Sequence, residues 1–324
     1  MSRKAKQFLS LLAALHCCGG VFAQGTEEAD AIRLYQRGMK LLGDGDTEES
    51  LERFNSVAKR YRGSQACAMA LWEIYRIQET LGNDEAAFEA LNRLATEQPG
   101  HFEKAQAAQL KLVRRLLGSD PKSKRSLEFK NTPKAVLPEI LLAMLNAIVK
   151  SGHQSEAGIE AQFLRGLVHD RADQKQQAIA SYEDFTENFP NHELADDAAF
   201  QVADIPYRQW KQMRGGSPRQ REAAAVGLSW FLARYTESDK AAQARANLAE
   251  VHVAERRELL GLARFYESRS KQAAADVYYR QLGEKFPEFV TADETLATKV
   301  RASVATAKPT ALTSGPEDRK VKPQ

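Results

Sequence analysis

Several short stretches of the sequence carry residues that could do chemistry, and in each the required pattern is incomplete. The run Asp44-Gly45-Asp46-Thr47-Glu48 begins like a calcium-binding loop, but its twelfth position holds Asn55 where that loop needs Glu. The run Gly227-Leu228-Ser229-Trp230-Phe231 lacks the second Gly of a nucleophile elbow. No Gly-rich phosphate loop and no His-Glu-x-x-His motif occurs, and four histidines are scattered: His153, His169, His192 and His252. We therefore expect no enzyme: no catalytic residues, no metal, no cofactor and no small-molecule substrate.

The first 23 residues have the pattern of a secretory signal peptide. Arg3, Lys4 and Lys6 precede a short apolar stretch that ends at Leu15, and cleavage after Ala23 fits a signal peptidase. About eight apolar residues are too few for a membrane span, which needs about 20. We expect an exported, periplasmic protein.

The same segment leaves a second way of processing open. Cys17 or Cys18 could be a lipidated cysteine that anchors the chain to the outer membrane. His16 stands just before them, where lipoprotein signals normally have Gly, Ala or Ser, so we favour conventional cleavage. Membrane contact is expected only through such an anchor. The remaining cysteine, Cys67, suggests neither a disulfide framework nor a metal knuckle.

The charge balance excludes a nucleic-acid partner. The chain has 46 Lys and Arg against 43 Asp and Glu, and three of the basic residues lie in the signal peptide, which has no acidic residue. The remaining chain is thus 43 against 43. Binding to a phosphate backbone needs a clustered basic excess, which is missing here.

The strongest pattern is an internal repeat with small residues at fixed spacing. Gly166 is followed after twelve residues by Ala178, and Ala178 after twelve more by Pro190. The same spacing recurs with Ala263, Ala275 and Pro287. Small residues let two antiparallel helices approach closely, and Pro ends the second helix. Weaker copies of the frame begin at Gly38, Gly82 and Ala203.

These repeats predict an all-α fold of the tetratricopeptide type, an α-solenoid of about five to six helix pairs. We expect two units over residues 24–100 and further units over residues 156–298. Residues 101–155 are less regular, and form either a helical insertion or a degenerate repeat. From residue 299 to 324 the chain has no apolar period, so this tail is expected to be disordered.

One equivalent position of the first helices is aromatic and faces the expected concave side. It is occupied by Tyr35, Trp72, Phe163 and Phe200, with Arg76 near Trp72. These residues could line a partner-binding groove for an extended peptide or a helix. The alternative, which we favour for the set as a whole, is that the rings pack between neighbouring helices. Tyr35 and Trp72 are the better groove candidates.

Parts of the chain resemble a narrower family, the BamD-type (YfiO-like) outer-membrane assembly lipoproteins. The similar segments are YQRG at 35–38, SLERF at 50–54, AKRYRGS at 58–64, FLARYTES at 231–238 and RRELLGLARFY at 256–266. The resemblance covers roughly residues 30–100 and 155–295. Residues 100–155 depart from it, as does the lipid-attachment signal. It implies a non-enzymatic scaffold in outer-membrane β-barrel assembly.

In that family the N-terminal repeats present a groove to client segments, and the C-terminal repeats dock the central barrel subunit, BamA. The implied partners are therefore BamA and unfolded outer-membrane proteins. A general periplasmic scaffold for envelope, cell-division or cell-wall enzymes is the alternative. An accessory to a cell-wall hydrolase is a third hypothesis.

Overall fold

The structure, a computed structural model, describes residues 27–118, 137–213 and 216–306. Within these ranges all regular secondary structure is helical, which confirms the all-α expectation. The chain divides into two compact units, Met1–Ala198 and Ala199–Gln324, which we describe separately. The signal segment, Cys17 and Cys18 lie outside the described residues.

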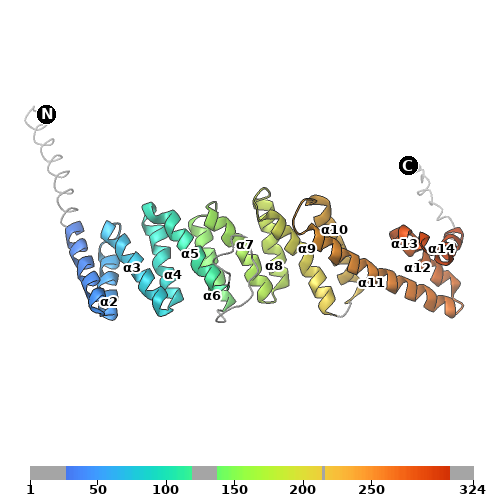
Figure 1. The fold of residues 1–324 in the computed structure, drawn as a ribbon, viewed down its shortest axis with the longest axis horizontal. Helices are drawn as coiled ribbons and strands as arrows, with labels where there is room; N and C mark the ends of the chain where they lie inside the picture. Colours follow the sequence, from blue (N-terminus) through green and yellow to red (C-terminus); the bar gives the residue numbers. More distant parts are fainter. Residues whose placement is uncertain (1–26, 119–136, 214–215, 307–324) are drawn as a thin grey trace, which may run out of the picture. The chain divides into compact units, whose positions relative to one another are not determined.

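The first unit is a row of helices in which consecutive helices pack on each other (Figure 1). A first helix covers residues 27–44. It is followed by α2 (Thr47–Arg60), α3 (Gln65–Leu81), α4 (Asp84–Glu97), the 3₁₀ turn η1 (Pro99–His101), α5 (Phe102–Leu116), α6 (Pro138–Ser151), α7 (Glu156–Arg171) and α8 (Lys175–Asn188). Contacts also join α4 to α6 and α5 to α7, so that neighbouring helix pairs stack. This is the tetratricopeptide arrangement.

The second unit is organised by one long helix. Its elements are α9 (Ala195–Gln212, which begins in the last residues of the first unit), α10 (Pro218–Arg234), α11 (Ala241–Ser268), α12 (Gln272–Lys285), α13 (Pro287–Thr291) and α14 (Glu294–Ala305). The first half of α11 completes a core with α9 and α10. Its second half completes another core with α12, α13 and α14. The described residues thus hold six helix pairs, at the upper end of the expected number.

Small residues hold the two helices of a pair together, as the spacing predicted. A Cβ added to Gly166 would lie 2.6 Å from the ring of Tyr182, and one added to Gly38 would lie 2.8 Å from the ring of Phe54. In the first pair the hydroxyl of Ser50 also donates a hydrogen bond of 2.9 Å to the carbonyl of Gly38. An aromatic ring of the second helix therefore lies directly on the backbone of the first.

Gly82 does not have the role that its place in the repeat frame predicted. It ends α3 in the left-handed conformation, with φ of 75°, and nothing lies within 4 Å of its Cβ position. The turn residue of other pairs stands at the same place and also has positive φ: Gly45, Asp173 and Ser270. The position equivalent to Gly166 in this pair is Tyr75, which is buried, with the small Ala87 twelve residues later. Here the first helix carries a large residue where the pairs of Gly38 and Gly166 have a small one, and Ala87 keeps the small residue of the second helix.

The expected start of a disordered tail at residue 299 is wrong. Helix α14 continues to Ala305, and Val300 and Ser303 on it are buried. Asp293 caps the helix by accepting hydrogen bonds from the N–H groups of Thr295 and Leu296. The helix closes the end of the second core, and residues 307–324 lie outside the described part.

Residues 101–155 hold the helices α5 and α6, which join the stack through a buried glutamine. Gln106 donates hydrogen bonds to the carbonyl of Ile148 and to the hydroxyl of Ser151, and its Oε1 accepts one from Ser155. One side chain thereby ties α5 to the turn between α6 and α7. Burial without these partners would be costly.

Replacing Gly166 with Ala should destabilise the protein by about 1–3 kcal/mol, because the added Cβ overlaps the Tyr182 ring. In an open helix the same change stabilises by roughly 0.5–1 kcal/mol. Gly261 in α11 has no atom within 4 Å of its Cβ position, so Gly261→Ala is the control and should stabilise. Thermal and urea unfolding followed by circular dichroism measures both. Stabilisation by both changes would contradict the close contact.

Candidate functional site

A partly exposed aromatic and basic surface lies on the first unit around Trp72. The indole N–H of Trp72 donates a hydrogen bond of 3.3 Å to Nδ1 of His101, in η1. Lys104 Nζ lies 5.6 Å from the centre of the Trp72 ring, a cation–π contact. The ring of Tyr75 meets it edge-on at 6.0 Å. Trp72 is therefore held in place from two neighbouring elements.

Tyr35 and Arg76 extend this surface toward the first helix. Arg76 has 70% of its side chain exposed and pairs with Glu73 at 3.3 Å. The pKa of the Tyr35 hydroxyl is raised, first by burial and then by the nearby carboxylate of Glu73, while Arg76 opposes the shift. The Tyr35 ring rests on Phe54 with centres 5.5 Å apart. We call Tyr35, Trp72, Arg76, His101 and Lys104 the Trp72 surface.

The Trp72 surface places apolar and cationic groups side by side. Its rings offer apolar area, and Arg76 and Lys104 offer cationic groups beside it. The repeat pattern identified Tyr35, Trp72 and Arg76. It missed His101 and Lys104, because they reach Trp72 from the next pair of helices and no spacing in the sequence reports that contact.

The other two proposed groove residues, Phe163 and Phe200, do not line a groove. Phe163 is 2% exposed and packs on Tyr182 and Phe185, with ring centres 5.3 and 5.7 Å away. Phe200 is 4% exposed and packs on Phe231 at 5.5 Å. In both pairs the second helix supplies aromatic rings that enclose the phenylalanine, which has no polar atom to keep at the surface. The packing alternative is correct for these two residues.

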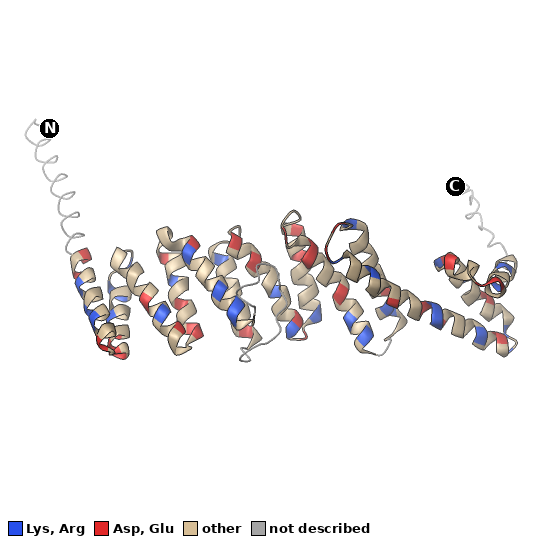
Figure 2. Ribbon diagram, viewed as in Figure 1, with Lys and Arg blue, Asp and Glu red and all other residues tan. Residues whose placement is uncertain are grey.

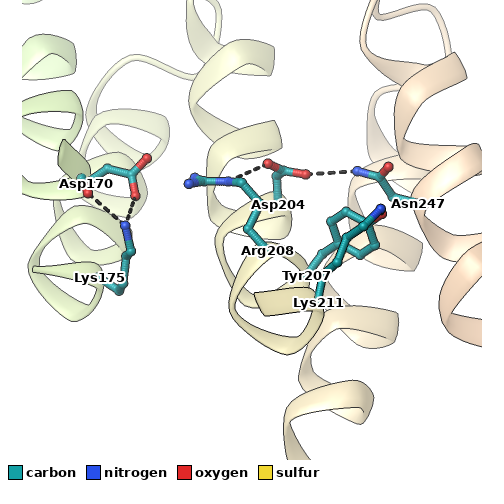
Figure 3. A network of polar contacts seen from close by, with 7 residues as sticks. All are labelled: Asp170, Lys175, Asp204, Tyr207, Arg208, Lys211 and Asn247. Carbon is teal, nitrogen blue, oxygen red and sulfur yellow. Dashed lines mark hydrogen bonds and ion pairs between the residues drawn. The ribbon is translucent and has the colours of Figure 1, made fainter. Parts of the chain in front are cut away.

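A polar network in the second unit contains groups that serve as acids and bases in enzymes, but here they join helices. The carboxylate of Asp204 accepts hydrogen bonds of 2.8 Å from Arg208 and 2.9 Å from Asn247, which links α9 to α11 (Figure 3). In the first unit Lys175 donates in a similar way to the carbonyl and the carboxylate of Asp170, across the turn between α7 and α8.

Tyr207, Lys211 and Glu250 form a triad between α9 and α11. The Tyr207 hydroxyl donates to Glu250 at 2.6 Å, and Lys211 donates to both at 3.1 and 2.9 Å. The pKa of Lys211 is raised by its hydrogen bonds to Glu250 and Tyr207, and the pKa of Glu250 is lowered by its hydrogen bonds from Tyr207 and Lys211. Both shifts favour the charged forms, which is what an ion pair needs and what a proton-transfer site avoids.

A second triad of the same composition closes the end of the second unit. The Tyr279 hydroxyl donates to Glu267 at 2.9 Å, and Lys299 of α14 donates to Glu267 at 2.7 Å. The pKa of Glu267 is lowered, first by the hydrogen bond from Lys299 and then by that from Tyr279. The triad fastens α14 to α11 and α12.

Metal clusters and membrane-spanning helices are both missing from the described residues. No group of three or more His, Cys, Asp or Glu side chains among them is placed to hold a metal ion. None of the helices they form is long and apolar enough to cross a membrane. Basic and acidic residues are interspersed in both units (Figure 2).

Comparison with known proteins supports the family resemblance over part of the chain. Residues 169–312 match the family YfiO, described as an outer membrane lipoprotein. The chain matches none of the curated proteins compared with it. The resemblance to BamD-type lipoproteins is thus confirmed for the second unit and the end of the first, while residues 27–168 lie outside the match.

Several solved structures of tetratricopeptide proteins are distantly similar. A thermophilic TPR protein of Thermus thermophilus is 16% identical, covers 69% of this chain and 99% of its own, and has a TM-score of 0.30. A tetratricopeptide repeat protein of Parabacteroides merdae is 12% identical, with 85% and 98% covered and a TM-score of 0.28. PilW, a type IV pilus biogenesis factor, is 15% identical, with 83% and 97% covered and a TM-score of 0.29. These likenesses carry no argument about function.

Glu267→Gln should lower stability at pH 7 by about 0.5–1 kcal/mol, the range of a partly exposed ion pair. Because the pKa of Glu267 is lower in the folded chain, its contribution is full above the ordinary Glu pKa of about 4.3 and is lost as the pH falls through the lowered value. Melting curves of the variant and the parent should therefore converge once the pH lies below that lowered pKa. Glu294→Gln, in a pair that is exposed on both sides, is the control and should change little. A difference that persists at low pH would show a packing effect instead.

Proposed function

We propose that the chain is a non-enzymatic, protein-binding scaffold in the assembly of outer-membrane β-barrel proteins. One observation carries this proposal: residues 169–312 match a family of outer membrane lipoproteins. Stacked helix pairs suit the role, since a solenoid offers extended surfaces for other chains. The proposal includes export to the periplasm, with or without a lipid anchor at the outer membrane.

The two units would serve different partners. The second unit carries most of the family match, and would dock the central barrel subunit, BamA. The Trp72 surface on the first unit would hold segments of unfolded outer-membrane proteins, which alternate apolar and polar side chains along each strand. Its rings would bind the apolar side chains, and Arg76 and Lys104 would bind carboxylates beside them.

A second candidate is a general periplasmic scaffold for envelope, cell-division or cell-wall enzymes. It is favoured by the extent of the match, which leaves the Trp72 surface outside the family region. Affinity purification of the tagged chain from solubilised membranes separates the two. Recovery of the barrel subunit supports the first proposal, and recovery of division or wall enzymes without it supports the second.

Arg76→Glu should weaken capture of unfolded outer-membrane protein about tenfold without changing the melting temperature. The side chain is mostly exposed, and reversing its charge removes an attraction and adds a repulsion. The measurement is binding of a urea-unfolded, fluorescently labelled barrel protein after rapid dilution. Arg33→Glu on the first helix, also exposed, is the matched control and should bind normally. Equal binding by both variants would exclude the Trp72 surface as the client site.

Processing at the N-terminus decides how the scaffold is held. With conventional cleavage after Ala23, replacement of both Cys17 and Cys18 by Ala should leave gel mobility and membrane association unchanged. With lipidation, the parent should take up labelled palmitate, its processing should be sensitive to globomycin, and the double variant should be released from membranes. Uptake of the label by the parent would overturn the cleavage that the sequence favours.

A further inference from the structure

Helix α10 in the second unit is apolar on both sides. Its inner side carries Ala224, Leu228 and Phe231, which are buried in the core. On its outer side Val226 is 63% exposed and Trp230 is 51% exposed. The smaller Ala223 and Ala233 on that side are exposed as well. A helix with one covered face normally exposes polar and charged side chains on the other, and the apolar strip between Ala223 and Ala233 departs from this pattern.

In the other helix pairs, the second helix exposes few or no large apolar side chains on its outer side. At the corresponding place α8 exposes acidic side chains: Glu183, Asp184 and Glu187. Among the described residues, α2, α4, α6 and α8 expose no large apolar side chain, and α12 exposes one, Val277. Between Ala223 and Ala233 helix α10 has no charged residue; its four charged residues, Arg219, Arg221, Glu222 and Arg234, stand toward its two ends. The apolar outer side is therefore a property of this helix and does not come from the repeat.

The exposed tryptophan is held by its neighbours. Its ring meets that of Tyr235 edge-on, with centres 6.3 Å apart, and Tyr235 stacks on the buried Phe231 at 5.5 Å. The guanidinium of Arg234 covers Tyr235 at 5.8 Å. A ring fixed in this way loses little freedom when a partner covers it, which is how binding hot spots are built.

The residues of this outer side are arranged symmetrically along the chain about Leu228. Val226 and Trp230 each stand two residues from Leu228, and Ala223 and Ala233 each stand five residues from it. Steps of three and four residues alternate along this series, which is the spacing of the contact seam in paired helices. In an antiparallel pair about a two-fold axis, residues at equal distance from the centre face each other.

We propose that α10 docks against α10 of a second copy of this chain, antiparallel, with the two-fold axis opposite Leu228. Val226 of one copy then faces Trp230 of the other. The two-fold axis repeats this contact, so two pairs of a small and a large side chain lie at the centre of the interface. Ala223 faces Ala233, and these small pairs let the two backbones approach. The proposal depends on the second unit alone and is independent of the proposed function.

Charges at the ends of the seam complete the match. Arg219 lies in the first turn of α10 and Glu237 in the turn that follows its last residue, and both are exposed. The antiparallel arrangement brings Arg219 of one copy to the end where Glu237 of the other lies, so unlike charges meet. A parallel arrangement would bring like charges together. With only two large side chains from each copy, the contact is small, and we expect a dimer that depends on concentration.

Sedimentation velocity of the purified full chain, from about 1 to 200 µM, tests the proposal. The parent should show a weight-average mass that rises toward twice that of the monomer. Trp230→Arg should weaken self-association at least tenfold with an unchanged melting temperature. Asp184→Arg places the same residue at the equivalent outer position of α8 and should leave the dimer intact. A chain that stays monomeric throughout, or a dimer unaffected by Trp230→Arg, would overturn the proposal.

Cysteine cross-linking tests the orientation. In a background with Cys17, Cys18 and Cys67 replaced by Ala, a mixture of Ala223→Cys and Ala233→Cys chains should form a disulfide-linked dimer under mild oxidation. Each variant alone should form far less, because identical positions lie about 15 Å apart along an antiparallel pair. Efficient cross-linking by either variant alone would indicate a parallel contact and contradict the proposed orientation. If the chain forms no dimer and Trp230→Arg instead abolishes binding of a different protein, that protein covers α10 and the proposal is wrong.

Discussion

The close approach of two helices through a residue with almost no side chain is the constraint on which the fold depends. A helix of about 14 residues is marginal in water and needs its apolar side covered. With Gly38 or Gly166 in the first helix, an aromatic ring of the second helix can lie directly on the backbone of the first. The apolar sides of both helices are then covered. The pair of α3 and α4 departs from this, because Tyr75 stands at the place of the glycine and the buried Leu91 at the place of the ring. The small residue of the second helix, Ala87, is kept in this pair as well.

Much of the architecture could be predicted because spacing within a pair is local information. Gly166 with Ala178, and Ala263 with Ala275, are enough to locate both helices and their turn. The helices α4, α8 and α12 end where the repeat predicted, two residues before Pro99, Pro190 and Pro287. Helix α14 was missed although signals for it exist: Asp293 as the cap, and Leu296 and Val300 four residues apart. The Ala, Thr and charged residues around them make the helical spacing of apolar residues hard to recognise.

The candidate site was harder to predict, because the same repeat position has two outcomes. Trp72 and Phe163 are equivalent in sequence, yet one is partly exposed beside His101 and the other is enclosed by Tyr182 and Phe185. Whether the ring is exposed or buried depends on the side chains that the second helix and the next pair supply. Local sequence patterns do not predict those contacts. The two Tyr–Lys–Glu triads show the same limit, since each joins residues from separate helices.

Helix α11 has a mechanical consequence. Its 28 residues, about 42 Å of continuous helix, belong to two cores at once. In most arrays of repeats a disturbance is felt only by the adjoining pair. Because α11 contributes to both cores of the second unit, we expect the two cores to fold and unfold together. Strain applied at one end of this unit is then transmitted along the helix to the other end.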